Sequence, residues 1–267
     1  MTDETLRLET DADGVARVTL ARPERHNALD SALIGALATA AAQLARDGAV
    51  RAVVLTGEGE SFCAGADLGW MRAQMGADRA RRIAEATALA ETLRALDTLP
   101  KPLIARVNGQ AYGGGLGLMS VADLAIAARP GRFAFTEVRL GLTPATISPY
   151  VVRRMGEPRA REVFFSGRFF DADEAVRLGL AASAVARDAL DEAVTGAIAP
   201  YLSAAPGAVA DAKALVARQA GGVDSETIRA TAEALADRWE TAEAREGIAA
   251  FFEKRRPSWR QNGSGRG

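Results

Sequence analysis

The sequence predicts an α/β fold, in which a core of strands and helices is followed by a helical C-terminal part. Two observations support this prediction. Short apolar runs of strand length alternate with helical patterns in the first half, and from about residue 146 to 255 the pattern is almost entirely helical. The 267 residues, of which 48% are hydrophobic, are enough for one or two domains with a large buried core. We find no internal repeat and no linker, so the helical part should pack on the core or on another subunit.

The strand signals lie in the first half of the chain. Residues 6–8 and 15–20 alternate apolar and polar side chains around a turn at Asp13-Gly14, which predicts a β-hairpin. Three further runs are short, aliphatic and bounded by turn residues, and they predict buried strands: 51–56 (RAVVLT), 102–107 (PLIARV) and 124–127 (LAIA). Helical patterns lie between them, which is the alternation expected of an α/β core.

Asp30 is the expected N-cap of the first helix. The core-facing residues of that helix recur every three or four positions, at Leu33, Leu37, Ala41 and Leu44. A longer pattern covers about 77–98 and ends before Pro100, because proline cannot continue a helix. We divide the chain into a core (1–200), a helical C-terminal region (201–258) and a tail (259–267) whose Gly-rich composition predicts flexibility.

Composition excludes several classes of function. Lys and Arg total 33 against 34 Asp and Glu, so the net charge of −1 gives no general attraction to nucleic acid or to an anionic membrane. The single cysteine, Cys63, and the single histidine, His26, exclude an internal disulfide, a cysteine-based zinc site and His-rich metal sites. The N-terminus lacks a signal-peptide pattern, and no run approaches the roughly eighteen apolar residues of a membrane helix. We therefore expect a cytoplasmic protein without a metal, a membrane span or a nucleic-acid partner.

Two glycine-bearing loops each follow a predicted buried strand, at 61–67 (SFCAGAD) and 108–115 (NGQAYGGG). The second is not a dinucleotide-binding GxGxxG motif, because Leu118 occupies the last glycine position. Glycine lets backbone N–H groups approach a ligand where a Cβ atom would clash, so two such loops can direct two donors at one oxygen. The alternative is that these glycines serve only tight turns and close packing, and the residues alone leave both interpretations open.

Glu137 stands in a strongly apolar segment, RFAFTEV (132–138). Burial there would disfavour the charged carboxylate and raise its pKa, which suits proton transfer near neutral pH. The alternative is a structural glutamate at a strand end that pairs with Arg132 or Arg139. The residues alone favour neither interpretation.

Six short segments, spread over nearly the whole chain, form one set: 22–29 (RPERHNAL), 62–68 (FCAGADL), 104–109 (IARVNG), 113–115 (GGG), 122–124 (ADL) and 251–256 (FFEKRR). In this order and separation they resemble the enoyl-CoA hydratase/isomerase (crotonase) family. The resemblance implies an α/β crotonase fold, a spiral of ββα units with a helical C-terminal trimerisation region, assembled as a homotrimer or homohexamer. It also implies an acyl-CoA thioester as substrate and no cofactor, since coenzyme A is part of the substrate.

The same resemblance implies that two backbone N–H groups, those of Ala66 and Gly114, hold the thioester carbonyl oxygen. The substrate-binding positions that it implies are Arg25, Ala64, Ala66, Asp67, Leu68, Gly69, Gly114, Phe251 and Lys254. Phe251 and Lys254 match a pair that reaches the CoA of an adjacent subunit. The alternative for these two residues is an ordinary terminal amphipathic helix with a solvated lysine.

Hydratases of this family usually carry two catalytic glutamates, and this chain matches only the second. Gly117 stands at the first position and Glu137 at the second. The resemblance therefore implies hydration of a 2-enoyl-CoA by Glu137 as acid and base. Double-bond isomerisation is the alternative, and non-catalytic acyl-CoA or RNA binding is a minor one.

Segments 64–71, 136–142 and 144–152 look like those of a bacterial methylglutaconyl-CoA hydratase branch of leucine and acyclic-terpene catabolism, which also lacks the first glutamate. This finer resemblance implies 3-methylglutaconyl-CoA as substrate. We expect Gly117 to leave room for a carboxylate or a branch of the acyl group. Further candidates for the acyl pocket are Trp70, Met71, Tyr112 and Ile147.

Overall fold

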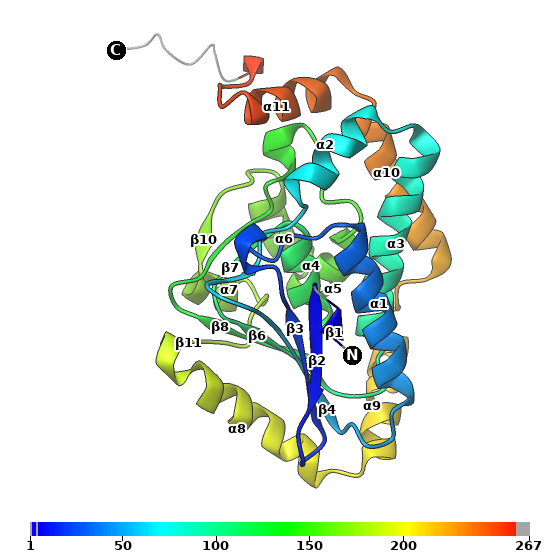
Figure 1. Ribbon diagram of the computed structural model, residues 1–267, viewed down its shortest axis with the longest axis vertical. Coiled ribbons are helices and arrows are strands. Elements are labelled where there is room, and N and C mark those ends of the chain that lie inside the picture. Colours follow the sequence, from blue (N-terminus) through cyan, green and yellow to red (C-terminus); the bar gives the residue numbers. More distant parts are fainter. Residues whose placement is uncertain (1, 4, 260–267) are drawn as a thin grey trace.

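A seven-stranded sheet forms the centre of the fold, in the order β1-β2-β3-β4-β6-β8-β11 (Figure 1). The structure, a computed structural model, describes residues 2, 3 and 5–259 of the chain. The strands of this large sheet are β1 (Thr2–Asp3), β2 (Leu6–Thr10), β3 (Val15–Leu20), β4 (Ala52–Gly57), β6 (Leu103–Val107), β8 (Leu124–Ala128) and β11 (Ser183–Val185). The first three strands pair antiparallel, which confirms the predicted hairpin, and from β3 onward the strands run parallel.

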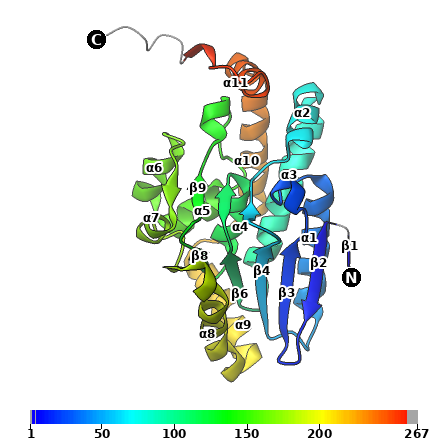
Figure 2. The same cartoon turned by 60° about the vertical axis from the view of Figure 1, so that its left-hand side comes forward.

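Helices cover both faces of this sheet and make up most of the C-terminal end (Figure 2). They are α1 (Ser31–Arg46), α2 (Leu68–Gly76), α3 (Arg79–Asp97), α4 (Gly114–Val121), α5 (Ser148–Met155), α6 (Glu157–Phe164), α7 (Ala172–Arg177), α8 (Leu190–Ser203), α9 (Pro206–Gln219), α10 (Ser225–Trp239) and α11 (Ala242–Phe252). Short 3-10 turns form η1 (Pro23–Arg25), η2 (Glu137–Leu140) and η3 (Arg187–Ala189). The predicted cap of α1 is confirmed, since the Asp30 carboxylate accepts a hydrogen bond from the Leu33 amide at 2.9 Å.

β4 is buried on both faces, as its uninterrupted apolar run requires. Val53 and Leu55 point into the large hydrophobic core that α1 and α3 cover. Ala52 and Val54 point to the opposite face, because successive side chains of a strand alternate between faces. The residues of α8 that cover this second face are Leu190, Val194 and Ile198.

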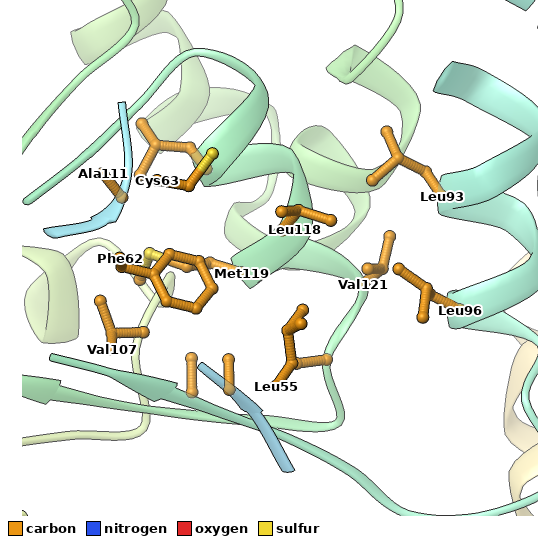
Figure 3. Packing of buried hydrophobic residues seen from close by; sticks show 14 of the residues in the cluster. Leu55, Phe62, Cys63, Leu93, Leu96, Val107, Ala111, Leu118, Met119 and Val121 are labelled. Atoms are coloured by element: carbon orange, nitrogen blue, oxygen red, sulfur yellow. The ribbon is translucent and has the colours of Figure 1, made fainter. Parts of the chain in front are cut away.

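α4 lies inside the core, and all of its residues from 115 to 121 are buried. A helix that is apolar all round is stable only when other elements enclose it. In Figure 3, Met119 lies toward Phe62 and Val121 toward Leu96 of α3, all within one cluster of buried residues. These buried contacts hold the N-terminus of α4 in a fixed position.

A second, smaller sheet has the strand order β10-β9-β7-β5. Its strands are β5 (Ser61–Cys63), β7 (Gln110–Tyr112), β9 (Arg132–Ala134) and β10 (Phe170–Asp171). The sequence did not predict this sheet, because strands of two or three residues are too short to show a period of two. β5, β7 and β9 run parallel, so their carboxyl ends meet at one edge, and the chain continues there into Ala64, Gly113 and Phe135.

The expectation of an almost entirely helical chain after residue 146 is wrong at two places. β10 pairs with β9, and β11 joins the large sheet beside β8, with Ser183 opposite Ile126. Both strands are too short to interrupt the helical pattern of the sequence. Among the described residues no single helix is long and apolar enough to span a membrane, although the bent pair Arg187–Ser203 and Pro206–Gln219 passes that test jointly.

The C-terminal helices α10 and α11 pack back onto the core, which is one of the two arrangements expected from the sequence. α10 lies along α3, and α11 lies over η2 (Figure 1). One cluster of buried residues joins them to α2 and to the chain after η2: Met71, Leu142, Trp239, Ala244 and Ile248. Of the tail predicted to be flexible, 260–267 lies outside the described residues.

Candidate active site

A cavity of about 440 Å³ lies at the edge where β5, β7 and β9 end. α2, α3 and α10 supply much of its wall, through residues such as Leu68, Leu89 and Trp239. The lining is mainly apolar, and Glu137, Glu85 and Arg139 are its charged residues. An apolar cavity with a few converging polar groups is the usual form of a small-molecule site.

Glu137 is the first residue of η2, three residues after β9. Its side chain lies against Gly113, where an added Cβ atom would come within 2.9 Å of the Oε1 atom. The other oxygen, Oε2, is buried and has no hydrogen-bond partner among the described residues. The carboxylate is therefore held close to the N-terminus of α4 without being neutralised by a protein group.

Burial raises the pKa of Glu137 to about 7, and a hydrogen bond to its own backbone only partly opposes this effect. In the described structure Glu137 forms no ion pair with Arg132 or Arg139. Instead both guanidinium groups lie over the ring of Phe169, at 4.6 and 4.7 Å from its centre. At neutral pH the carboxyl group is thus balanced between its acid and base forms, as proton transfer requires.

The loop that carries Ala66 passes close to the chain at Tyr112 and Gly114. Gly65 has φ +84, and a Cβ atom there would lie 2.7 Å from the Tyr112 carbonyl oxygen and 3.7 Å from the Gly114 nitrogen. The chain around Ala66 is fixed from both sides, since Leu29 donates to the Gly65 carbonyl at 2.7 Å and accepts from the Asp67 amide at 2.9 Å.

Within the described part of the chain, neither the Ala66 amide nor the Gly114 amide donates to a protein acceptor. The Gly114 amide also benefits from the positive end of α4, because a helix concentrates partial positive charge at its first N–H groups. Two free amides and one buried carboxylate are the groups that an oxyanion hole with an acid–base residue requires.

The sequence profile of the family described as "Enoyl-CoA hydratase/isomerase" matches residues 10–262. The chain belongs to this family. Its activity class is accordingly that of the acyl-CoA hydratases, and acyl-CoA thioesters are the substrate class of the family.

Solved structures of similar sequence support this membership. An enoyl-CoA hydratase from Shewanella pealeana is 38% identical, with 96% of each chain covered and a TM-score of 0.78. AtuE of Pseudomonas aeruginosa is also 38% identical at a TM-score of 0.78, over 97% of this chain and 100% of that one. An enoyl-CoA hydratase from Mycobacterium avium is 32% identical at a TM-score of 0.84, over 97% and 100%. The predicted crotonase fold is confirmed.

Most of the positions that the family resemblance implied line the cavity: Ala64, Ala66, Leu68, Gly114, Glu137 and Phe251. The further candidates for the acyl pocket line it as well: Trp70, Met71, Tyr112 and Ile147. Arg25, Asp67, Gly69 and Lys254 do not. Arg25 and Lys254 are exposed at the surface, and their contacts with CoA stay a prediction.

Asp67 holds the loop in place. Its carboxylate accepts hydrogen bonds from the amides of Gly69 at 2.8 Å and Trp70 at 3.2 Å, and it pairs with Arg22 at 3.1 Å. Burial would raise the pKa of Asp67, but these two amides and the guanidinium outweigh it and hold the pKa below its usual range. Arg22 also donates to the Ala28 carbonyl, so it ties the N-terminal segment to the loop that carries Ala66.

The space expected beside Gly117 does not exist. A Cβ atom at Gly117 would lie 2.6 Å from Cγ2 of Ile147, so the isoleucine side chain fills the place of the missing glutamate. Sequence reasoning named Ile147 as a cavity residue but missed its neighbour Thr146 and Arg139, which also line the cavity. No local pattern could have found them, since only the fold brings η2 and the segment after it to the cavity beside α4.

Cys63 is fully buried, and burial raises the pKa of its thiol to about 12, so it stays protonated and inert. Across the described residues, no group of three or more His, Cys, Asp or Glu side chains is placed to hold a metal ion.

Proposed function

We propose that the protein adds water to a 2-enoyl-CoA thioester, with Glu137 as general base and then general acid. The proposal rests on one observation: the buried, unpaired Glu137 carboxylate lies beside Gly113, next to the unengaged amides of Ala66 and Gly114. Membership of the hydratase/isomerase family supports it at the level of the reaction class.

The residues account for both halves of the addition. Ionised Glu137 accepts a proton from a water molecule while the water oxygen forms a bond to Cβ, and the electron pair of the double bond moves toward the thioester oxygen. The amides of Ala66 and Gly114 stabilise that enolate oxygen, by about 3 kcal/mol for each donor. Protonated Glu137 then gives its proton to Cα, which leaves a 3-hydroxyacyl-CoA and an ionised Glu137.

The pH dependence follows from the raised pKa of Glu137. The base form is needed for attack by water, so kcat/KM for hydration should rise with pH through an apparent pKa of about 7 and level off above it. Initial rates in a series of buffers of constant ionic strength measure this profile. A flat profile between about pH 5 and pH 8 would contradict the assignment of Glu137 as the base.

As substrate we propose 3-methylglutaconyl-CoA, whose acyl group ends in a free carboxylate that needs a cation. Arg139 is the cation of the cavity, and it pairs with no carboxylate among the described residues. The test compares loss of conjugated-thioester absorbance with 3-methylglutaconyl-CoA and with crotonyl-CoA. Faster decay with the first supports this substrate, whereas preference for crotonyl-CoA contradicts it and leaves the hydratase proposal intact.

Replacing Arg139 by methionine should raise KM for 3-methylglutaconyl-CoA about tenfold, since a solvent-exposed charge-assisted hydrogen bond is lost. KM for crotonyl-CoA should not change. Arg132→Met is the matched control, because Arg132 lies over the same Phe169 ring at 4.6 Å but does not line the cavity. An equal rise in KM for both substrates would instead assign Arg139 to the CoA moiety.

Isomerisation is the second candidate. It is favoured because Gly117 carries no carboxylate and Ile147 occupies the space beside it. Moving a double bond needs one group that takes a proton from one carbon and returns it to another, and Glu137 is a cavity carboxylate with an unpartnered oxygen among the described residues. Incubation with a 3-enoyl-CoA distinguishes the reactions by mass and NMR, because hydration adds one water and isomerisation leaves the mass unchanged.

A further inference from the structure

Thr146 carries a buried hydroxyl that makes no hydrogen bond to any described residue. The residue is 4% exposed, and its Oγ1 atom has no hydrogen-bond partner in the described structure. Only five buried side-chain atoms of the described residues lack a partner, and two of them belong to residues that line the cavity: Oε2 of Glu137 and Oγ1 of Thr146. A buried hydroxyl without a partner lowers stability, so its presence at a reaction site calls for a ligand.

Contacts with the start of α4 relate Glu137 and Thr146 in space. Gly113 lies against Oε1 of Glu137, and Gly117, four residues later, lies against Ile147, the neighbour of Thr146. Both Glu137 and Thr146 therefore lie near the start of α4, and both line the same cavity. A water molecule that hydrogen-bonds to two oxygens bridges up to about 5.6 Å, which is the separation of Oε2 of Glu137 and Oγ1 of Thr146 that a shared water requires.

The turn that carries Thr146 is fixed. The Ser148 amide donates to the Ala145 carbonyl at 3.1 Å, and the Ser148 hydroxyl donates to the same oxygen at 2.7 Å. Ile147, packed on Gly117, prevents the turn from moving toward α4. Thr146, which lines the cavity, is thus held by a rigid segment, as positioning of a reactant requires.

We propose that Thr146 is a positioning residue for the attacking water, an inference that rests on the hydration proposed above. Glu137 accepts the proton that leaves the water, and Oγ1 of Thr146 accepts the hydrogen that stays on the oxygen and becomes the 3-hydroxyl of the product. With two partners the water directs a lone pair at Cβ. With Glu137 alone it rotates freely and attacks less often. Thr146 thereby supplies the second polar contact that Gly117 does not provide.

The test is Thr146→Val, which has the same shape without the hydroxyl. We expect kcat for hydration of 3-methylglutaconyl-CoA and crotonyl-CoA to fall roughly 10- to 100-fold with KM unchanged, because only the orientation of water is lost. The thermal midpoint should stay the same or rise, since an unpartnered buried hydroxyl is removed. Thr146→Ser keeps the hydroxyl and should restore most of the rate.

Thr92→Val is the matched control, because Thr92 is 2% exposed, lies on α3 outside the cavity and donates to the Ala88 carbonyl at 2.8 Å. It should lower the thermal midpoint and leave kcat unchanged. Wild-type kcat in Thr146→Val, or equal losses in the Val and Ser variants, would overturn the role of Thr146. Loss of the hydratase proposal has a different signature, namely an active Glu137→Gln.

Discussion

Glu137→Gln should lower kcat for hydration by roughly 10²–10⁴ while the protein folds normally, because glutamine keeps the shape of the side chain and cannot transfer a proton. The site geometry makes this the largest effect of any single change, since Glu137 is the cavity carboxylate with an unpartnered oxygen among the described residues, whereas Glu85 accepts hydrogen bonds from Ser31 and Trp70. Steady-state rates with enoyl-CoA substrates measure it. Turnover like that of the wild type would remove Glu137 from the mechanism.

The same substitution should stabilise the protein at high pH. Burial raises the pKa of Glu137 from 4.5 to about 7, so the folded state binds the proton more tightly than the unfolded state. The stability that this proton confers is present below about pH 4.5 and is lost as pH rises through about 7. Glutamine never ionises, so the variant should be more stable than the wild type by up to about 3 kcal/mol above pH 7.

Urea unfolding at about pH 5 and pH 8 tests this sign. We expect a gain for Glu137→Gln that is several times larger at the higher pH. A gain that does not depend on pH would show that the native pKa is close to its ordinary value, and a loss at the higher pH would mean that the ionised carboxylate has a partner.

Gly65→Ala should lower kcat by roughly 10²–10³, because it displaces the Ala66 amide from the enolate oxygen. The added Cβ atom would meet the Tyr112 carbonyl oxygen at 2.7 Å, and the φ of +84 is unfavourable for alanine. The backbone must move to relieve this contact. Backbone strain and the displaced loop should together lower the free energy of unfolding by about 2–4 kcal/mol.

Gly221→Ala separates the two effects. Gly221 has a similar φ of +65, but nothing lies within 4 Å of its Cβ position, and it follows α9 far from the cavity. This variant should lose stability through backbone strain alone and keep full activity. If Gly65→Ala were destabilised to the same small extent as Gly221→Ala and remained fully active, the Ala66 amide would not belong to an oxyanion hole.

Local patterns in the sequence determined much of the large sheet and its helices. The β2–β3 hairpin, the Asp30 cap and the buried strands β4, β6 and β8 all follow from periodicity and turn residues, which act over a few neighbouring positions. For the site, the residues alone left two interpretations open for Glu137 and for each glycine loop. The family resemblance chose between them, and the cavity that contains Ala66, Gly114 and Glu137 agrees with that choice.

The tertiary structure alone decided how the site is enclosed. The strands β5, β7 and β9 are three residues long, too short for a period, yet their parallel pairing brings three distant loops to one edge. Packing between segments about thirty residues apart placed Ile147 in the space beside Gly117, so the room expected there is absent and Thr146 reaches the cavity instead. Periodicity records which face of an element is buried but not what it is buried against, and that second fact determines the site.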